Sequence, residues 1–495
     1  MGGLWSAVER RAELSPDAEM LVDEHGRRMS FAGFRDRAGR LSSALAQRGV
    51  AEGVAVTWQL PTGIDALVLT AALARLGAVQ NPVITSQSGR HVEFVLRQTS
   101  AALLVAPEST RAVAERVGLD LLVASGLPER DVLIAAAAPS KATRWVFYTS
   151  GTTAEPKGAR HSDASVLASA RAMGERLRCT SADRVGMVFP VAHIGGCGTW
   201  LGASLLYGCA LILDSRFEAR HSSAVQRRER VTLAGSGSVF TQSYLAAQRL
   251  APSQPLFPDV RAFTCGGAGR PANLHAEVKR ELGGVGVLSG YGLTEAPILA
   301  MASPDDPDEA MAGTEGRVSE GVDLRVVAAD GTRLGPGEVG ELRVKGPQVM
   351  QGYVDARLDM DAFDAEGYLR TGDLGRLDER GYLTITGRAK DVIIRKGETI
   401  SARTIEEDLL RHPGVDDVAV IAVPDPDRGE LACAVIVPVP GLPVPTLAEL
   451  VTYLCGVGLP VRQCPEQLRV VAALPRTSTG KVRKDELRAF AAGHG

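Results

Sequence analysis

The chain has 495 residues, of which 45% are hydrophobic and 23% charged, as in most globular proteins. At this length one hydrophobic core is too small, so at least two domains are expected. The net charge of −3 argues against broad nucleic-acid binding and against a polybasic membrane patch.

The first two thirds of the chain alternate between helical and strand patterns. Apolar spacing predicts a helix over residues 41–48, a strand over 54–59, a helix over 64–76 and strands over 101–106 and 145–148. A helix over residues 164–177 follows, with Asp163 as its predicted cap. Such alternation predicts an α/β fold with parallel sheets in a large N-terminal domain.

The sequence pattern changes near residue 322, after which short predicted strands alternate with turns. Asp330-Gly331 and Pro336-Gly337 are turn signals, so a β-rich subdomain is predicted over residues 322–388. From residue 391 the order strand, helix, strand, strand, helix, strand predicts a small α+β C-terminal domain.

The cysteines and the hydrophobic segments indicate the cellular compartment of the protein. The seven cysteines are dispersed without a Cys-x-x-Cys pair, which favours neither a zinc site nor a disulfide framework. Residues 1–20 lack the apolar core of a signal peptide. The window over residues 66–79 contains Arg75 and is too short to span a bilayer. We therefore expect a cytoplasmic protein without a membrane span.

A loop rich in hydroxyl groups follows the strand at residue 148. Hydroxyls and backbone N–H groups around glycine, closed by one cation, suit a polyphosphate. Pro156 precedes the lysine, so the loop is not a Walker A motif. A Ser/Thr/Gly-rich surface turn is the alternative. The loop contains Thr149, Ser150, Gly151, Thr152, Thr153 and Lys157.

Two acidic residues stand in patterns that suit nucleotide chemistry. Glu295 follows Thr294 after a strand-like run, where a carboxylate suits a magnesium ion bridging phosphates; a turn with a helix cap is the alternative. Asp373 in a glycine-flanked turn suits both hydroxyls of a ribose, or is an Asx-turn. Arg388 suits a phosphate or a nearby carboxylate.

Lys481 follows a small-residue loop over residues 475–480. A mobile lysine there can deliver a point charge to a reaction centre, although most lysines are simply solvated.

Together these segments resemble the adenylate-forming superfamily of acyl-CoA synthetases, peptide-synthetase adenylation domains and firefly-type luciferases, and acyl-CoA synthetases most. The resemblance runs nearly end to end, with eight segments in the family's order. They are residues 148–158, 189–193, 266–268, 291–295, 368–373, 387–397, 412–415 and 475–481.

The resemblance implies an ATP-dependent ligase that makes an acyl-adenylate with release of pyrophosphate and then transfers the acyl group to coenzyme A. It implies that the loop ending at Lys157 holds the β- and γ-phosphates and that Thr294 binds the α-phosphate. Glu295 would hold Mg²⁺, and Lys481 would bridge the acid and the α-phosphate. Gly266, Gly267, Ala268, Tyr291 and Gly292 would bind adenine, and Asp373 with Arg388 the ribose.

The resemblance also implies a mobile C-terminal domain. The N-terminal domain would cover residues 1–388, the hinge residues 389–390 with Lys390, and the C-terminal domain residues 391–495. Rotation would bring Gly397 to the site, where a residue without a side chain lets pantetheine pass. Ala154 and Ala402 depart from the family's usual Gly and Pro, and neither change touches a catalytic side chain.

The acid and the acceptor are less defined. His193, Gly195, Gly235 and Ser236 stand in the implied acyl pocket, whose small walls predict a bulky alicyclic, aromatic or medium-chain acid. Alternatively the glycines only allow tight packing and His193 is a core histidine rather than a gate. A separate acyl carrier protein is the alternative acceptor, and a lysine acetyltransferase acting on Lys481 is a further predicted partner.

Overall fold

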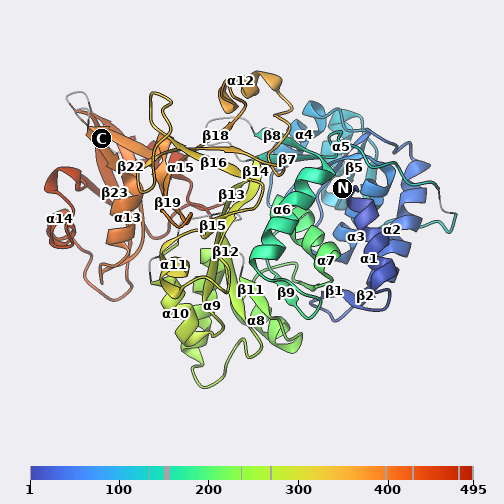
Figure 1. The fold of residues 1–495 in the computed structure, drawn as a ribbon, viewed down its shortest axis with the longest axis horizontal. Helices are drawn as coiled ribbons and strands as arrows, with labels where there is room; N and C mark the ends of the chain where they lie inside the picture. The colour runs from blue at the N-terminus through green and yellow to red at the C-terminus, as the bar shows by residue number, and fades with distance from the viewer. Residues whose placement is uncertain are drawn as a thin grey trace. The chain divides into compact units, whose positions relative to one another are not determined.

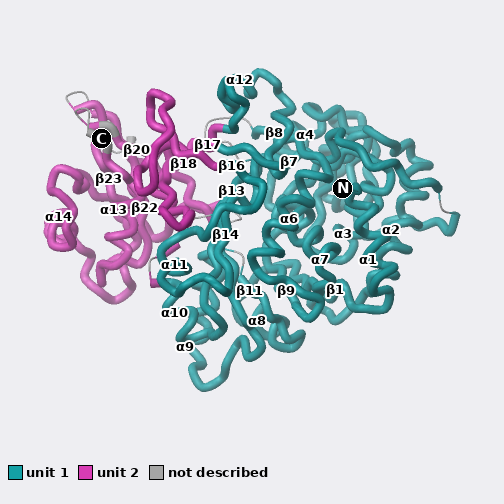
Figure 2. The backbone as a smooth tube through the Cα atoms, viewed as in Figure 1, with its two compact units in different colours: residues 1–267, 274–323, 344–369 teal, residues 268–273, 324–343, 370–495 magenta. Residues whose placement is uncertain are grey.

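The computed structural model describes residues 2–132, 134–149, 156–235, 237–267, 270–271, 273–395, 398–425, 428–477 and 480–492. The chain forms two compact units (Figure 2). Unit 1 comprises residues 1–267, 274–323 and 344–369, and unit 2 comprises residues 268–273, 324–343 and 370–495. The domain boundary expected at residues 389–390 remains a prediction.

Unit 1 contains a six-stranded sheet that is parallel except for its last strand. Helices α4 (Gly89–Gln98) and α5 (Arg111–Val117) pack on one face of this sheet. In sheet order its strands are β6 (Leu121–Val123), β5 (Leu103–Ala106), β3 (Ala55–Trp58), β4 (Val79–Pro82), β7 (Trp145–Thr149) and β8 (Lys157–His161).

Unit 1 also contains a nine-stranded sheet, in which six consecutive strands, the third to the eighth in sheet order, are parallel. In sheet order the nine strands are β15 (Arg317–Val318), β14 (Ala296–Met301), β13 (Val287–Leu293), β12 (Ala262–Gly266), β11 (Leu233–Gly235), β9 (Arg184–Met187), β10 (Ala210–Leu213), β1 (Glu19–Asp23) and β2 (Arg28–Ser30). Helices α8 (Ala219–Arg228), α9 (Ser238–Leu250) and α10 (Leu274–Glu281) pack on one face.

The largest core of unit 1 contains residues from both sheets and from five helices (Figure 1). They are α1 (Leu4–Leu14), α2 (Phe31–Ala46), α3 (Ile64–Leu76), α6 (Asp163–Arg176) and α7 (Leu201–Tyr207). Helix α3 is almost wholly buried, which explains why it is apolar on every side rather than on one stripe. Gly77 ends it with a φ of +67°, a conformation that favours glycine.

Unit 2 contains two sheets. The four-stranded sheet has the order β16 (Asp323–Val327), β17 (Gly340–Lys345), β18 (Leu369–Leu377) and β19 (Leu383–Arg388). The five-stranded sheet comprises β21 (Glu398–Ser401), β20 (Val392–Arg395), β23 (Gly429–Pro438), β22 (Val415–Asp425) and β24 (Gln467–Val470). Helices α13 (Ala402–Leu409) and α14 (Leu447–Gly456) share one core with it, and α15 (Lys484–Ala492) shares another.

Several local predictions are corrected. The helix expected over residues 41–48 is the end of α2 (Phe31–Ala46), which begins after its N-cap Ser30. Ser162, not Asp163, caps α6. The buried Asp163 carboxylate instead accepts hydrogen bonds from the Leu4 N–H and the Trp145 indole, so it ties the N-terminus to β7. Helix α15 was not predicted.

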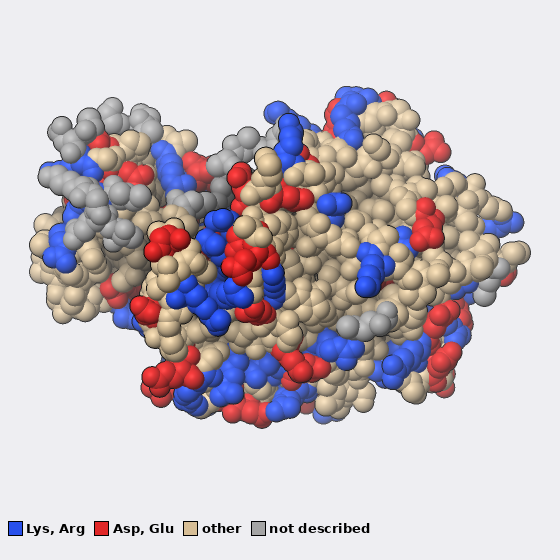
Figure 3. Space-filling view, turned by 45° about the horizontal axis from the view of Figure 1, so that its top comes forward, with Lys and Arg blue, Asp and Glu red and all other residues tan. Residues whose placement is uncertain are grey.

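One face of the molecule carries charged side chains of both signs (Figure 3). On the face in Figure 3, blue basic side chains are interspersed with red acidic ones. Arg249, for example, pairs with both Glu277 and Glu281. None of the helices in the described residues is long and apolar enough to cross a membrane.

Candidate active site

Four neighbouring parallel strands of unit 1 end at one edge of the nine-stranded sheet. Strands β13, β12, β11 and β9 lie next to one another, so their carboxyl ends meet there. The segments that follow or finish these strands carry the predicted site residues His193, Gly235, Gly266, Tyr291 and Glu295. In parallel α/β sheets this edge is where ligands bind.

The hairpin of β7 and β8 brings the predicted phosphate lysine to the base of its loop. Thr149 at the end of β7 pairs with Lys157 at the start of β8. Residues 150–155, which connect these two in the sequence and include Ser150, Gly151, Thr152, Thr153 and Ala154, lie outside the described residues.

A tyrosine that the sequence did not single out joins the lysine to the acidic residue. The Lys157 ammonium lies 5.6 Å from the ring centroid of Tyr353, within the range of a cation–π contact. The hydroxyl of the same Tyr353 donates to Oε1 of Glu295 at 2.8 Å. Burial and the Glu295 carboxylate raise the pKa of Tyr353, so its hydroxyl stays protonated as a donor.

The turn that carries Thr294 and Glu295 is held from two sides. Glu295 lies between β13 and β14, and its carbonyl accepts the Met350 N–H at 2.8 Å. The carbonyl of Thr294 accepts from Nε2 of His161, also in β8, at 2.9 Å. Because a carbonyl only accepts, Nε2 carries the proton. Nδ1 lies 3.1 Å from the Ser165 hydroxyl oxygen, which is also 2.9 Å from the Ser162 carbonyl oxygen.

The burial of His161 is expected to make the free energy of unfolding depend on pH. Burial lowers its pKa to about 4, from 6.5. Between those values the unfolded chain binds a proton that the folded chain excludes, so stability falls as the pH is lowered from 6.5 to 4. The slope from this one group is up to about 1.4 kcal/mol per pH unit.

We expect His161→Gln, which keeps an N–H but does not titrate, to lose stability less steeply over this window than the unmodified protein. Thermal unfolding midpoints at pH 5, 6 and 7 measure the difference. His25→Gln is the control, because the His25 side chain is 74% exposed. Equal pH slopes for all three proteins would contradict the buried neutral histidine.

The glycines of the predicted acyl pocket differ in how much room surrounds them. Gly235 has a φ of +89°, and a Cβ there would lie 2.5 Å from the carbonyl oxygen of Thr264 on β12. At Gly196 a Cβ would lie 2.6 Å from the Val191 carbonyl oxygen. Both glycines are therefore required by backbone packing, and their small size carries no information about the acid. At Gly237 the nearest atom, in the Phe240 ring, would be 3.5 Å away, an ordinary contact. Ser236 lies outside the described residues.

This contrast gives a matched pair of substitutions. We expect Gly235→Ala to lower the unfolding midpoint, since an L-residue in the left-handed region costs about 1 kcal/mol before any clash. Gly237→Ala should leave the midpoint unchanged and report on the pocket instead. Differential scanning fluorimetry on both proteins measures this, and an unaltered midpoint for Gly235→Ala would refute the packing role.

His193 has a local structural role. Its side chain is half-buried, and its Nδ1 accepts from the Gly195 N–H at 3.1 Å as the N-cap of a π-helical segment, Ile194–Trp200. Loss of hydration lowers the pKa of His193 to about 4, so the ring is neutral and able to accept at neutral pH. π-Helical turns occur often at functional sites. A gating role for His193 stays a prediction.

The predicted adenine segment lies at the ends of β12 and β13. Gly266 pairs with Gly290 on the neighbouring strand, and a Cβ on Gly266 would lie 3.0 Å from the Gly290 carbonyl oxygen. Gly267 has a φ of +77°, with open space where a Cβ would be. Tyr291 is buried in β13, and a Cβ on Gly292 would lie 2.5 Å from the Ile298 nitrogen. Ala268 lies outside the described residues.

In unit 2, Asp373 and Arg388 form a pair. They face each other across β18 and β19, and Arg388 Nε lies 2.8 Å from Asp373 Oδ1. Asp373 is buried in a strand, so the predicted glycine-flanked turn is wrong, although Gly372 beside it does have a φ of +68°. Of the two partners considered for Arg388, a phosphate or a nearby carboxylate, the structure shows the carboxylate of Asp373. Lys390 lies in a short 3-10 turn, Ala389–Asp391, and Gly397 lies outside the described residues.

The backbone of Lys481, in unit 2, is hydrogen-bonded to Thr477. The Thr477 N–H donates to the Lys481 carbonyl at 2.8 Å, and the Lys481 N–H donates to the Thr477 hydroxyl at 3.1 Å. Gly480 has a φ of +85°. These bonds fix the backbone from which the half-buried lysine side chain extends.

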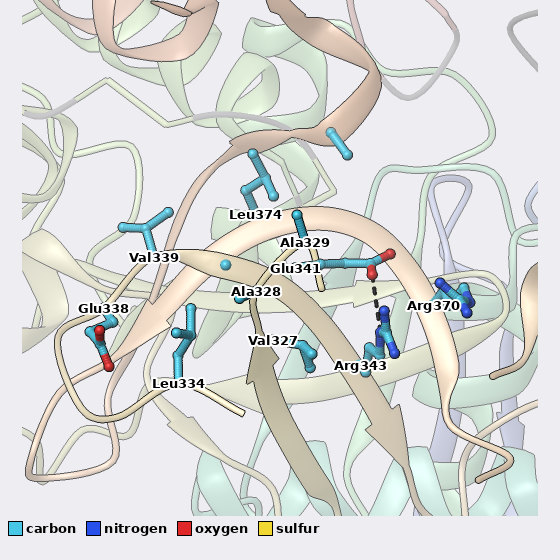
Figure 4. Close-up of a pocket in the computed structure, with 12 residues that line it drawn as sticks. Val327, Ala328, Ala329, Leu334, Glu338, Val339, Glu341, Arg343, Arg370 and Leu374 are labelled. Atoms are coloured by element: carbon cyan, nitrogen blue, oxygen red, sulfur yellow. Dashed lines mark hydrogen bonds and ion pairs between the residues drawn. The ribbon is translucent and has the colours of Figure 1, made fainter. Parts of the chain in front are cut away.

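A cavity of about 800 Å³ opens on the four-stranded sheet of unit 2 (Figure 4). Leu374 points into it, whereas its neighbour Asp373 belongs to the opposite face of the strand, because successive side chains alternate. The Glu341 carboxylate in its lining pairs with the Arg343 Nε at 3.0 Å. The cavity therefore lies on the other face of the sheet from Asp373.

Two known protein-family domains match most of the chain. The family described as AMP-binding enzyme matches residues 8–354, and its C-terminal domain family matches residues 404–481. The chain belongs to the AMP-binding enzyme family. It is 31% identical to the medium-chain fatty-acid–CoA ligase of Escherichia coli (strain K12), over 98% of this chain and 91% of that protein.

Solved structures of family members share this fold. ATP-bound MatB from Rhodopseudomonas palustris is 28% identical, with a TM-score of 0.90 over 99% of both chains. O-succinylbenzoate coenzyme A synthetase (MenE) from Bacillus subtilis, in complex with ATP and magnesium ion, is 27% identical, with a TM-score of 0.87 over 99% of both chains. The predicted α/β fold and the predicted likeness to acyl-CoA synthetases are confirmed.

Two residues of this site, Tyr353 and His161, were not predicted. Tyr353 lies 58 residues from Glu295, and His161 lies 133 residues from Thr294. One feature of the sequence could have indicated His161. Lys157, Ala159 and His161 are alternate residues of β8, so their side chains lie on the same face of the strand. Ala159 also forms an isolated bridge with Tyr353, which brings the tyrosine alongside that strand.

Proposed function

We propose that Lys157, Tyr353, Thr294 and Glu295 form the phosphate- and magnesium-binding part of an adenylation site. The protein is an AMP-forming acid–thiol ligase that uses ATP, Mg²⁺ and coenzyme A. The observation that carries the assignment of residues is the contact of a cation and a carboxylate with one tyrosine, beside four parallel strand ends.

Glu295 is suited to a magnesium ion. Its Oε1 accepts from Tyr353, and its Oε2 accepts no hydrogen bond from the residues that the structure describes. Mg²⁺ in nucleotide sites commonly takes one or two carboxylates, substrate phosphates and water. When bound, Mg²⁺ neutralises charge on the phosphate oxygens.

The first half-reaction joins two anions. Lys157 and the hydroxyls of residues 149–153 bind the β- and γ-phosphates, and Thr294 binds the α-phosphate. Lys481 bridges that phosphate and the acid, whose oxygen attacks the α-phosphorus as pyrophosphate leaves. Positioned cations lower the barrier because they offset the repulsion between the anions.

The adenosine is held by two further sets of groups. Gly266, Gly267, Ala268, Tyr291 and Gly292 bind adenine. Asp373 accepts the ribose hydroxyls, and Arg388 orients the carboxylate through their 2.8 Å contact.

In the second half-reaction the thiol of coenzyme A attacks the acyl carbonyl and AMP leaves. We assign the hinge to Lys390 and the passage of pantetheine to Gly397. We also propose Arg395 as a contact for the phosphates of coenzyme A. Arg395 pairs with Glu466 in this structure, so phosphate binding would require that pair to open.

For the acid we propose a bulky alicyclic, aromatic or medium-chain carboxylic acid. The proposal now depends on His193, Gly195 and Gly237, because Gly235 and Gly196 are needed for packing. Free coenzyme A is the acceptor that we propose. A separate acyl carrier protein, acetylation of Lys481 by a lysine acetyltransferase, and a cytoplasmic location stay predictions.

A panel of carboxylic acids in a pyrophosphate-release assay tests the proposal. Acetate, octanoate, benzoate and cyclohexanecarboxylate are compared, each with and without coenzyme A. We expect the larger acids to be preferred and thioester to form only with coenzyme A. Preference for acetate would overturn the acid assignment. Pyrophosphate release without thioester would overturn coenzyme A as the acceptor.

A further inference from the structure

Two cysteine sulfurs lie in contact in unit 2. Cys455 Sγ is 3.9 Å from Cys464 Sγ. Cys455 lies in the last turn of α14, and Cys464 follows a 3-10 turn, Val461–Gln463, that turns the chain back. A disulfide bond is about 2.05 Å long, so the sulfurs must close by about 2 Å, a movement within the reach of side-chain rotation.

The two thiols differ in access. All seven cysteines lie within the described residues, and Cys455 is the one that is exposed. Cys464 is 2% exposed and packs in the core beneath α13 and α14. Burial raises the pKa of Cys464 to about 12. A soluble oxidant therefore meets Cys455 first. Cys464 lies near enough to attack the oxidised sulfur, and because its thiol is protonated at neutral pH, its proton must pass to the departing hydroxyl as the disulfide forms.

The two cysteines lie close in sequence to Glu466, the partner of Arg395, which we propose as a coenzyme A contact. Glu466, two residues after Cys464, pairs with Arg395 and accepts the Ala432 N–H at 3.1 Å. Arg395 ends β20 opposite Glu398, and residues 396 and 397 between them lie outside the described residues. A covalent link at Cys464 thus restrains the segment that anchors Arg395.

We propose that Cys455 and Cys464 form a peroxide-sensitive dithiol whose oxidation to a disulfide slows thioester formation. The Cys455 thiolate attacks hydrogen peroxide, breaking the O–O bond and giving a sulfenic acid and, after protonation, water. Cys464 then attacks the sulfenic sulfur, displacing its oxygen as a second water. Two thiols are oxidised and one peroxide is reduced, and a dithiol reductant reverses the reaction.

Peptide mapping tests the disulfide independently of activity. The full-length protein is treated with hydrogen peroxide, blocked with iodoacetamide and digested with trypsin. Arg462 lies between the cysteines, so a disulfide joins two separate tryptic peptides. We expect that joined species, its loss with dithiothreitol, and its absence from Cys455→Ser. Oxidation of Cys455 to sulfinic acid without the joined species would overturn the proposal.

Two controls keep the test specific. Cys433→Ser changes a buried thiol on β23 and should still form the joined species. Cys464→Ala should leave Cys455 as a sulfenic acid that dimedone traps. Equal modification of all the cysteines would show general unfolding by peroxide and would overturn the dithiol.

The effect on activity rests on the proposed function and is measured separately. We expect peroxide to slow thioester formation from preformed acyl-adenylate by about tenfold, equivalent to about 1.4 kcal/mol, and to leave Cys455→Ser unaffected. A joined species with unchanged rates would overturn the regulatory role. Absence of adenylation before any oxidation would instead refute the proposed function.

Discussion

Replacing Lys481 with alanine is expected to slow acyl-adenylate formation by a hundredfold or more while leaving thioester formation from preformed adenylate nearly unchanged. Removing one preorganised charge from a reaction centre typically costs about 3 kcal/mol. In the proposed mechanism, Lys481 supplies that charge only when the carboxylate meets the α-phosphate. Both hydrogen bonds between Lys481 and Thr477 are made by the Lys481 backbone, so alanine removes the ammonium and keeps these bonds.

The two half-reactions separate this role from a structural one. Pyrophosphate exchange with acid and ATP measures the first, and thioester formation from synthetic adenylate and coenzyme A measures the second. Arg483→Ala is the matched control, because it removes an exposed cation two residues away that pairs with Glu486. Similar losses in both half-reactions for Lys481→Ala would contradict its assignment.

Replacing Glu295 with glutamine is expected to lower the adenylation rate by about a hundredfold and to raise the Mg²⁺ concentration needed for half-maximal rate. Glutamine keeps the shape of the side chain and an oxygen that can accept the Tyr353 hydroxyl. It loses the negative charge that the metal ion requires. The Lys157 contact with the Tyr353 ring should remain.

Tyr353→Phe is the companion variant. It keeps the charge of Glu295 and the ring near Lys157 but removes the 2.8 Å hydrogen bond. A hydrogen bond to a charged group contributes about 1.5–3 kcal/mol, and solvent can replace part of it, so we expect a loss of about tenfold. Initial rates over a Mg²⁺ titration compare the proteins. If Glu295→Gln retains the unmodified Mg²⁺ dependence, Glu295 is not the metal ligand.

The reaction class could be predicted from the sequence because the motifs that indicate it are short. The predicted phosphate loop, the segment ending at Glu295 and the segment over residues 475–481 each contain their polar groups within a few residues. Such runs stay readable without the fold, since neighbours in sequence are neighbours in space. The helix over residues 64–76 was equally local and matches α3 to the residue.

Local reasoning failed where a contact crossed the chain. Asp163 looked like a helix cap, yet its carboxylate bonds to Leu4, 159 residues away, and Ser162 takes the cap. Asp373 looked like a turn residue, but pairing with β19 placed it in a strand opposite Arg388. In both cases tertiary packing overrode a local preference of aspartate for caps and turns.

The sequence by itself therefore determined the family, the α/β fold and the reaction, because each follows from ordered local motifs. Only the tertiary structure decided that Tyr353 joins Lys157 to Glu295 and that His161 holds the Thr294 turn. It also decided that Gly235 and Gly196 are small because neighbouring backbone leaves no room for a Cβ. These facts depend on which distant segments pack together, and no short run of residues encodes that.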